Sequence, residues 1–294
     1  MIRKTFFRGL LTAFFIFITC LYSFSDDSPE RIVSLSPNLT QVIYALGEFD
    51  NIVGVTIYDD FPPEAKELPK IGGWINPNYE AIISLKPDLI VLMKDQDTIF
   101  GEKIRELGLK TYVVDSNDSI NVILKSISDL GVVLNKDQEA KSLRNNIESN
   151  LNEIKEFTKD QQKKKVLIVV GRSPGTLEDI YVIGRDNYIN ELLVLAGGEN
   201  VVKNNRLSIK ITQEAILSFD PDVIVEVNHE KLDREAEILN TWANLKLSKA
   251  VSNDQVFILS STFLLHPSQR IVDGARVLAE ILHPEIKEKY GNNN

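Results

Sequence analysis

The chain contains little cysteine and little histidine, and this scarcity excludes several kinds of site. Its 294 residues include one cysteine, Cys20, and three histidines. If residues 1–25 are a signal peptide, the mature chain has no cysteine, so neither a disulfide framework nor a cysteine-based metal site is possible in it. A receptor for bare zinc or manganese ions needs several histidines and carboxylates around one ion, and three scattered histidines are too few. We therefore expect no resident metal or cofactor, and a fold that depends on its hydrophobic core.

Signs of an enzyme are also scarce. The mature chain offers no cysteine nucleophile, and no histidine has an evident carboxylate partner. The segment 171–175 (Gly-Arg-Ser-Pro-Gly) follows a predicted strand but lacks the form of a phosphate-binding loop. These absences argue against a periplasmic hydrolase, and we expect no enzymatic activity.

Positive charge is limited too. The chain has 33 lysines and arginines against 42 aspartates and glutamates, which gives a net charge of -9, and removal of Arg3, Lys4 and Arg8 with the signal peptide takes it to -12. Such an acidic protein does not suit nucleic acid or an anionic membrane surface as its main partner. A basic partner surface suits it better.

Long apolar runs are confined to the amino terminus. Three basic residues precede the run Gly9–Leu21, which is too short and too terminal for an ordinary membrane span and is typical of a signal peptide. Residues 23–25 (Ser-Phe-Ser) supply small side chains for a signal peptidase, so we expect cleavage before Asp26 and a periplasmic protein. Lipidation at Cys20 is an alternative, although Thr19 is bulky for the residue before that cut. The other alternative is that Cys20 is merely an apolar residue of a discarded segment.

Short β-branched runs alternate with helical patterns along the remaining chain. In the first half the candidate strands are Arg31–Leu35, Ile52–Val55, Leu89–Leu92 and Thr111–Val114, with helical patterns at Leu39–Leu46, Tyr79–Leu85 and Ile99–Leu107. The second half continues with Val166–Val170, Ile189–Ala196, Val223–Val225 and Val256–Leu259. This alternation predicts βαβ units, and so an α/β fold of two Rossmann-like lobes with mainly parallel sheets.

The two halves are separated by a long polar stretch with helical periodicity. From Asp137 to about Gln161, apolar residues recur every three or four positions and proline is absent. We predict an amino-terminal lobe at 26–135, a stiff connecting helix at 136–163 and a carboxy-terminal lobe at 164–294. The alternative is an ordinary helix within one domain.

One segment of the first half recurs in the second. Residues 80–91 (EAIISLKPDLIV) align without a gap with residues 214–225 (EAILSFDPDVIV), and eight of the twelve positions are identical. Each copy predicts a short helix that opens with a glutamate, a Pro-Asp turn and a buried strand. Such a repeat suggests that the lobes are related by a pseudo-twofold axis.

Five segments in this order and spacing resemble a known family of receptors. They are residues 31–40 (RIVSLSPNLT), 62–65 (PPEA, after Tyr58), 74–91, 196–200 (AGGEN) and 267–271 (PSQRI). Over essentially the whole mature chain, the sequence is similar to the vitamin B12, iron-siderophore and haem receptors of ABC importers, the helical-backbone class of substrate-binding proteins. The resemblance implies a monomer that captures one bulky ligand, a corrinoid or an iron chelate, and delivers it to a permease dimer.

The resemblance assigns a docking role to the repeated glutamates. In this family one glutamate on each lobe docks into arginine pockets of the two permease subunits, and Glu80 and Glu214 occupy those positions. A carboxylate forms a bidentate, charge-assisted pair with a guanidinium, and two such pairs suit a twofold-symmetric partner. The alternative is that both glutamates only stabilise the positive end of a short helix.

The resemblance also points to ligand contacts in the cleft between the lobes. Tyr58, Trp74, Tyr181 and Phe263 fall at aromatic ligand-contact positions, where rings favour a large, flat or apolar ligand; each alone is equally consistent with a core aromatic. The loop Ser36, Pro37 and Asn38 would lie at the cleft rim, or be only a strand-to-helix turn.

Two further side chains and two departures bear on the ligand. Arg270 would pair with an anionic group of the ligand, or bond nearby carbonyls at a helix start. His266, in the same loop, would reach a corrinoid or haem metal, or be an ordinary surface residue. Ser208 and Thr262 stand where the B12 receptor has an aromatic and an acidic residue, which leaves a related corrinoid, a haem or a ferric chelate open.

A surface adhesin is a rival function, but it would not require paired docking glutamates.

Overall fold

The computed structural model describes residues 28–115, 118–228, 234–259 and 262–286. The predicted signal peptide and Cys20 lie outside these residues. In the part of the chain that is described, no helix is both long enough and apolar enough to cross a membrane.

The amino-terminal lobe is built on a parallel sheet. Its four strands run in the order β2-β1-β3-β4, and every neighbouring pair is parallel. The strands are β1 Ile32–Ser34, β2 Ile52–Gly54, β3 Leu89–Met93 and β4 Thr111–Val114. The helices are α2 Pro37–Ala45, α3 Tyr79–Ser84, α4 Lys94–Gln96, α5 Glu102–Glu106 and α6 Ile120–Val133, with short 3-10 or π segments at Phe49–Asn51, Pro63–Glu67 and Asp97–Gly101. The four strands are those that the sequence predicts.

The carboxy-terminal lobe has a mixed sheet. Its order is β10-β9-β5-β6-β8, with β7 beside β5; β10, β9, β5 and β7 run parallel, whereas β6 is antiparallel to both of its neighbours, β5 and β8. The strands are β5 Lys164–Gly171, β6 Ile180–Ile183, β7 Gly198–Asn200, β8 Ser208–Ile211, β9 Val223–Val227 and β10 Val256–Leu259. The helices are α8 Tyr188–Leu195, α9 Gln213–Phe219, α10 Glu235–Trp242, α11 Lys249–Ser252 and α12 Ile271–Leu282, with a 3-10 turn at Thr262–Leu264.

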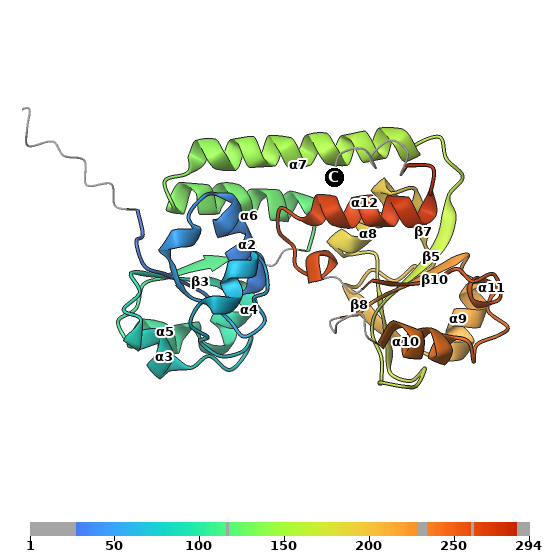
Figure 1. Ribbon diagram of the computed structural model, residues 1–294, viewed down its shortest axis with the longest axis horizontal. Coiled ribbons are helices and arrows are strands. Elements are labelled where there is room, and N and C mark those ends of the chain that lie inside the picture. The colour runs from blue at the N-terminus through green and yellow to red at the C-terminus, as the bar shows by residue number, and fades with distance from the viewer. Residues whose placement is uncertain (1–27, 116–117, 229–233, 260–261, 287–294) are drawn as a thin grey trace, which may run out of the picture.

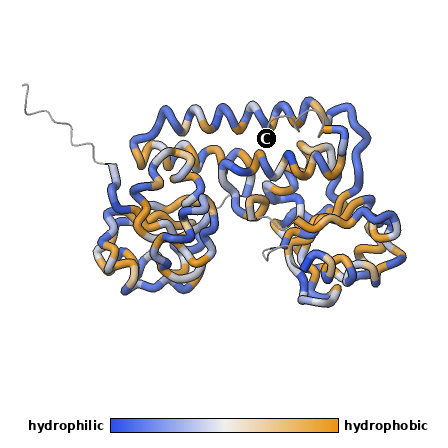
Figure 2. The backbone as a smooth tube through the Cα atoms, in the orientation of Figure 1, coloured by the Kyte–Doolittle hydropathy of each residue, from blue (hydrophilic) through white to orange (hydrophobic). Residues whose placement is uncertain are grey.

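Helix α7, Asp137–Thr158, connects the lobes. It runs along the top of both lobes in Figure 1, beside α6 and α12. Its buried stripe includes Ile147, Leu151 and Ile154, and its outward side is hydrophilic in Figure 2. The helix begins at Asp137, as the sequence predicts, and ends at Thr158, before the predicted end at about Gln161.

Alternate residues of each strand pack into different cores, as strand geometry requires. One central core runs through both lobes and includes the buried side of α7. It contains Ile32 and Val91 of the first sheet and Val166 and Val225 of the second. The opposite face of each sheet packs against an outer core, which contains Ile82 of α3 in the first lobe and Ile216 of α9 in the second. Helices α3 and α9 therefore lie on the faces of their sheets away from α7, as Figure 1 also shows.

The repeated sequence has the same structural role in both lobes. The carboxylate of Asp88 accepts the backbone N–H of Arg31 at 3.1 Å, and that of Asp222 accepts the N–H of Lys165 at 2.8 Å. In each lobe the Pro-Asp turn thus attaches the strand that follows it to the start of the central strand. A residue with positive φ, Lys86 in the first lobe and Asp220 in the second, ends each preceding helix.

Candidate functional site

The carboxyl ends of the two sheets face each other. The chain after β1 leads into α2, where Gln41 accepts a buried hydrogen bond from Ser268 of the other lobe at 2.6 Å. Beyond β2, the ring of Phe61 lies 4.3 Å from the guanidinium carbon of Arg270. Ser268 and Arg270 follow β10 in the second lobe. Ligands of α/β sheets bind at this edge, so the region where these two edges meet is the candidate site.

Two adjacent loops form the wall of the first lobe. The N–H of Ile57 donates to the carbonyl of Gly72 at 3.0 Å, and a Cβ at Gly73 would lie 3.6 Å from Cε2 of Tyr58. Tyr58 therefore lies beside the loop that carries Trp74, which is half-buried against the central core. The structure thus places two of the predicted ligand residues on adjacent loops.

Sequence reasoning missed the two aliphatic side chains beside these aromatics. Ile57 is 57% exposed and Ile75 is 62% exposed, comparable with 55% for Tyr58. With Trp74, these residues form an apolar rim, which we define as Ile57, Tyr58, Trp74 and Ile75. In the sequence, an isoleucine next to an aromatic is equally consistent with a core residue and with an exposed one. Only the structure shows that Ile57 and Ile75 are exposed.

Gln96 holds this wall in place. Its Nε2 donates to the carbonyls of Leu35 at 2.7 Å and Trp74 at 2.9 Å, while its Oε1 accepts the N–H of Met93 at 3.0 Å. The side chain is fully buried. It therefore ties the Trp74 loop to the carboxyl ends of β1 and β3, and a lone glutamine after a predicted strand gave no sequence signal for this role.

Ser36, Pro37 and Asn38 are all buried. Pro37 opens α2, and the hydroxyl of Ser36 donates to the side-chain carbonyl of Asn38. Asn38 also contacts the sulfur of Met93 at 3.5 Å. These three residues form the strand-to-helix turn at the cleft edge, with their side chains turned inward.

A buried carboxylate lies directly after the apolar rim. Asp59 is buried, and its Oδ2 accepts the N–H of Thr56 at 2.9 Å and the hydroxyl of Thr56 at 2.5 Å. Burial raises the pKa of Asp59 above its ordinary value, against the opposing effect of hydrogen bonds from Thr40 and Thr56.

The wall of the second lobe carries the other two predicted aromatics. Tyr181 is exposed on β6, where it pairs with Gly171 of β5 and Lys210 of β8. Phe263, in the turn after β10, is half-buried against the central core. Both lie at the edge of the sheet that faces the first lobe.

Arg270 lies between two rings from different lobes. Its guanidinium carbon is 4.3 Å from the ring centre of Phe61 and 5.1 Å from that of Phe263, and its Nε donates to Asp273 at 3.1 Å. Cation–π contacts of this kind are worth about 0.5–1 kcal/mol each at exposed sites. Arg270 therefore helps to join the lobes, in the same half-buried loop region as His266.

The structure also settles the nature of the segment 171–175, which has the Gly-x-Ser-x-Gly spelling of a hydrolase motif. A nucleophile elbow places its serine between a strand and a helix, with a histidine in reach. Here Ser173 enters a turn instead, and its hydroxyl donates to Asp179 at 2.7 Å. Within the described residues, moreover, no three histidine, cysteine, aspartate or glutamate side chains are grouped to hold a metal ion.

Glu80 and Glu214 occupy the same position in their helices. Each is the second residue after the N-cap, Asn78 for α3 and Thr212 for α9, and each N-cap side chain accepts the N–H of the third helical residue. Both glutamates are exposed, on the helices that lie away from α7. A hydrogen bond from Thr212 and the glutamate's own N–H lower the pKa of Glu214.

Two α/β lobes on one connecting helix, with aromatic side chains on facing edges, define a bilobed binding protein. Residues 32–262 match the family model described as periplasmic binding protein, and the chain belongs to that family. It is an ABC transporter substrate-binding protein of the helical-backbone class and not an enzyme.

Relatives and solved structures agree with this assignment. The chain is 31% identical over 263 residues to the ABC transporter substrate-binding lipoprotein YvrC of Bacillus subtilis, which covers 87% of this chain and 81% of the relative. It is 31% identical over 264 residues to the high-affinity heme uptake system protein IsdE of Staphylococcus aureus, covering 85% of this chain and 87% of the relative. The crystal structure of the periplasmic vitamin B12 binding protein BtuF of Vibrio cholerae matches with a TM-score of 0.72 and 26% identity, over 89% of this chain and 98% of that one.

Proposed function

We propose that this protein captures a corrinoid or an iron chelate between its lobes and docks on the permease dimer of an ABC importer through Glu80 and Glu214. One observation carries the proposal: exposed aromatic side chains lie on the facing edges of the lobes, while one exposed glutamate per lobe lies at the same helix position on the faces away from α7.

The apolar rim supports a large ligand with an apolar surface. Ile57, Tyr58 and Ile75 expose more than half of their surface, which is unfavourable in water unless a partner covers it. A flat macrocycle gains from contact with Tyr58 and Trp74 on this side and with Tyr181 and Phe263 on the other. Because Ser36, Pro37 and Asn38 are buried, they would support the apolar rim and not touch the ligand. Arg270 would contact only an anionic group at the outer edge of the ligand.

The environment of the glutamates supports docking. Among the identical residues of the repeat, Ile82 and Ile216 are buried, and Asp88 and Asp222 hold strands together. Glu80 is exposed instead. A carboxylate in the first turn is favourable for a helix by about 0.3–1 kcal/mol, and this effect alone does not require the same residue in both lobes. Two matched carboxylates suit two guanidinium groups on a twofold-symmetric partner.

The ligand class rests on the relatives and on two departures. IsdE is named for heme uptake and BtuF for vitamin B12 binding. Ser208 and Thr262 differ from the B12 receptor pattern, so a corrinoid other than cobalamin is the first candidate. A haem or a ferric siderophore is the second, favoured by the identity to IsdE along most of the chain.

The amino terminus supports a proposal for the cellular location. We propose that residues 1–25 direct export to the periplasm, with Cys20 as an alternative lipid attachment site. The B. subtilis relative is a lipoprotein, which supports that alternative.

The ligand is tested by mass spectrometry of the native protein, followed by titration with corrinoids, haem and ferric siderophores. Trp74→Ala should weaken binding of the true ligand at least tenfold, a loss of about 1.4 kcal/mol, without unfolding the protein. The control Tyr79→Ala removes a half-buried aromatic from α3, outside the cleft, and should leave the dissociation constant unchanged. An unaltered dissociation constant in Trp74→Ala would remove Trp74 from the site, and no binding of any of the three classes would refute the ligand proposal.

A further inference from the structure

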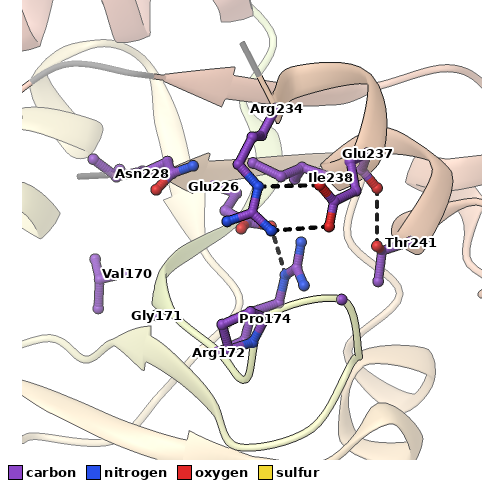
Figure 3. A pocket seen from close by; sticks show the side chains of 12 residues that line it. Val170, Gly171, Arg172, Pro174, Glu226, Asn228, Arg234, Glu237, Ile238 and Thr241 are labelled. Carbon is purple, nitrogen blue, oxygen red and sulfur yellow. Dashed lines mark hydrogen bonds and ion pairs between the residues drawn. The ribbon is translucent and has the colours of Figure 1, made fainter. Parts of the chain in front are cut away.

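A cavity with charged side chains in the second lobe includes Gly171, which pairs with Tyr181 across the sheet. It has a volume of about 240 Å³ and is lined in part by Gly171, Arg172, Glu226, Arg234, Glu237 and Thr241 (Figure 3). Gly171 ends β5, and Glu226 lies near the end of β9, so the cavity is at the edge of the sheet that faces the first lobe. Pockets for whole ligands usually measure roughly 300–1,000 Å³. This cavity therefore fits one peripheral group of a larger molecule.

The floor of the cavity is a buried ion pair. Nε of Arg172 donates to Oε2 of Glu226 at 3.0 Å, and the two side chains are only 5% and 8% exposed. The indole N–H of Trp242 donates to the same oxygen at 2.5 Å, and Nη1 of Arg172 donates to the carbonyl of Thr176 at 2.8 Å. Among the described residues, Nη2 of Arg172 and Oε1 of Glu226 have no hydrogen-bond partner.

The pair thus leaves one donor nitrogen, with its two N–H groups, and one acceptor oxygen for a third group. A buried ion pair adds little to stability compared with apolar side chains of similar size, because desolvation of the two charges offsets their attraction. A need for stability therefore does not explain why Arg172 and Glu226 are both present. Binding of a ligand group with its own donor and acceptor would explain it.

The charges around the cavity select the kind of group. A second pair, Arg234 and Glu237, lies across from the first, with Nη2 of Arg234 donating to Oε1 of Glu237 at 3.0 Å (Figure 3). The two arginines and two glutamates balance each other. A carboxylate entering the cavity would meet both glutamates and find each arginine already paired. A primary carboxamide accepts from Nη2 of Arg172 and donates to Oε1 of Glu226 without bringing a charge.

We propose that the cavity at Arg172 and Glu226 is a second subsite, which binds a neutral carboxamide arm of the ligand while the flat part of the ligand contacts the aromatic side chains. This subsite rests on the proposed function, because it takes the edge of the same ligand. It favours a macrocycle with amide side chains over one with carboxylate side chains.

The test compares two corrinoids that differ only at their side chains, one fully amidated and the other the corresponding polycarboxylic acid. Titration of the wild-type protein should give at least a tenfold lower dissociation constant for the amide. Glu226→Gln removes the negative charge while its amide oxygen still accepts from Trp242, so its preference for the amide should fall at least fivefold. Glu199→Gln, at an exposed pair with Lys203 in the same lobe, is the matched control and should keep the wild-type preference.

The outcomes separate this subsite from the proposed function. Equal affinities of the wild-type protein for the two corrinoids would overturn the subsite, and this result needs no variant to fold. An unchanged preference in Glu226→Gln, with binding still weakened by Trp74→Ala, would overturn the subsite and leave the ligand proposal intact. If neither corrinoid binds, the same comparison with haem and its bis-amide decides. No binding of either pair overturns the subsite, and the titration with ferric siderophores then decides the ligand proposal.

Discussion

The buried side chain of Gln96 provides a quantitative test of how the wall of the first lobe is held. Gln96→Met keeps nearly the same volume but removes three hydrogen bonds to the backbone of Leu35, Trp74 and Met93. A buried polar group left without its partner costs about 1–3 kcal/mol. If water partly replaces the three lost hydrogen bonds, Gln96→Met should lower the free energy of unfolding by about 3–5 kcal/mol in total.

Urea unfolding followed by tryptophan fluorescence measures this loss, and hydrogen exchange locates it. The variant should also exchange faster at residues 72–76 than the wild-type protein does, because the carbonyl of Trp74 loses its anchor. Gln162→Ala, at an exposed position, is the control and should stay within about 0.5 kcal/mol of wild type. A loss below about 1 kcal/mol in Gln96→Met, with unchanged exchange around Trp74, would refute the role of Gln96.

Three other expectations concern stability and shape. Ile216→Ala should cost about 2–5 kcal/mol in urea unfolding because Ile216 is fully buried, whereas Ile83→Ala, at an exposed position, should cost under about 1 kcal/mol; similar losses would contradict the outer cores. Burial lowers the pKa of His283 below its ordinary value of 6.5, so the unfolded chain takes up protons first as the pH falls through 6.5. Stability that His283 contributes above that pH is then lost. His283→Gln should therefore lose less stability than the wild-type protein between about pH 7 and about pH 5, and an equal loss in both proteins would contradict this role of His283. Because one core runs through both lobes and α7, the radius of gyration in X-ray scattering should hardly change on ligand binding, and a clear decrease would contradict a rigid connection.

The main architecture could be predicted from the sequence because its signals are local. Buried strands such as Leu89–Leu92 are continuous apolar runs, and the periodicity from Asp137 onward marks α7. Strands β6 and β8, which pair antiparallel with each other, were not predicted, since both are short and carry exposed residues such as Tyr181 and Ser208.

The site was harder to predict because its residues depend on contacts between distant segments. The sequence drew attention to Tyr58 and Trp74 but not to Gln96, whose partners lie 61 and 22 residues away along the chain. Arg270 has Phe61 as a neighbour only because the lobes meet there. The ion pair of Arg172 and Glu226, 54 residues apart, had no sequence signal for the same reason.

The central claim is that one carboxylate on each lobe delivers the loaded protein to its permease, and uptake by the double variant Glu80→Lys and Glu214→Lys tests it most directly. The control reverses two exposed carboxylates near the two ends of α7, Glu139→Lys and Asp160→Lys, with the same change in net charge. Ligand uptake by cells or by permease in liposomes should be lost in the first double variant and kept in the second, while both bind ligand with the wild-type dissociation constant. Normal uptake by the Glu80 and Glu214 variant would contradict the account.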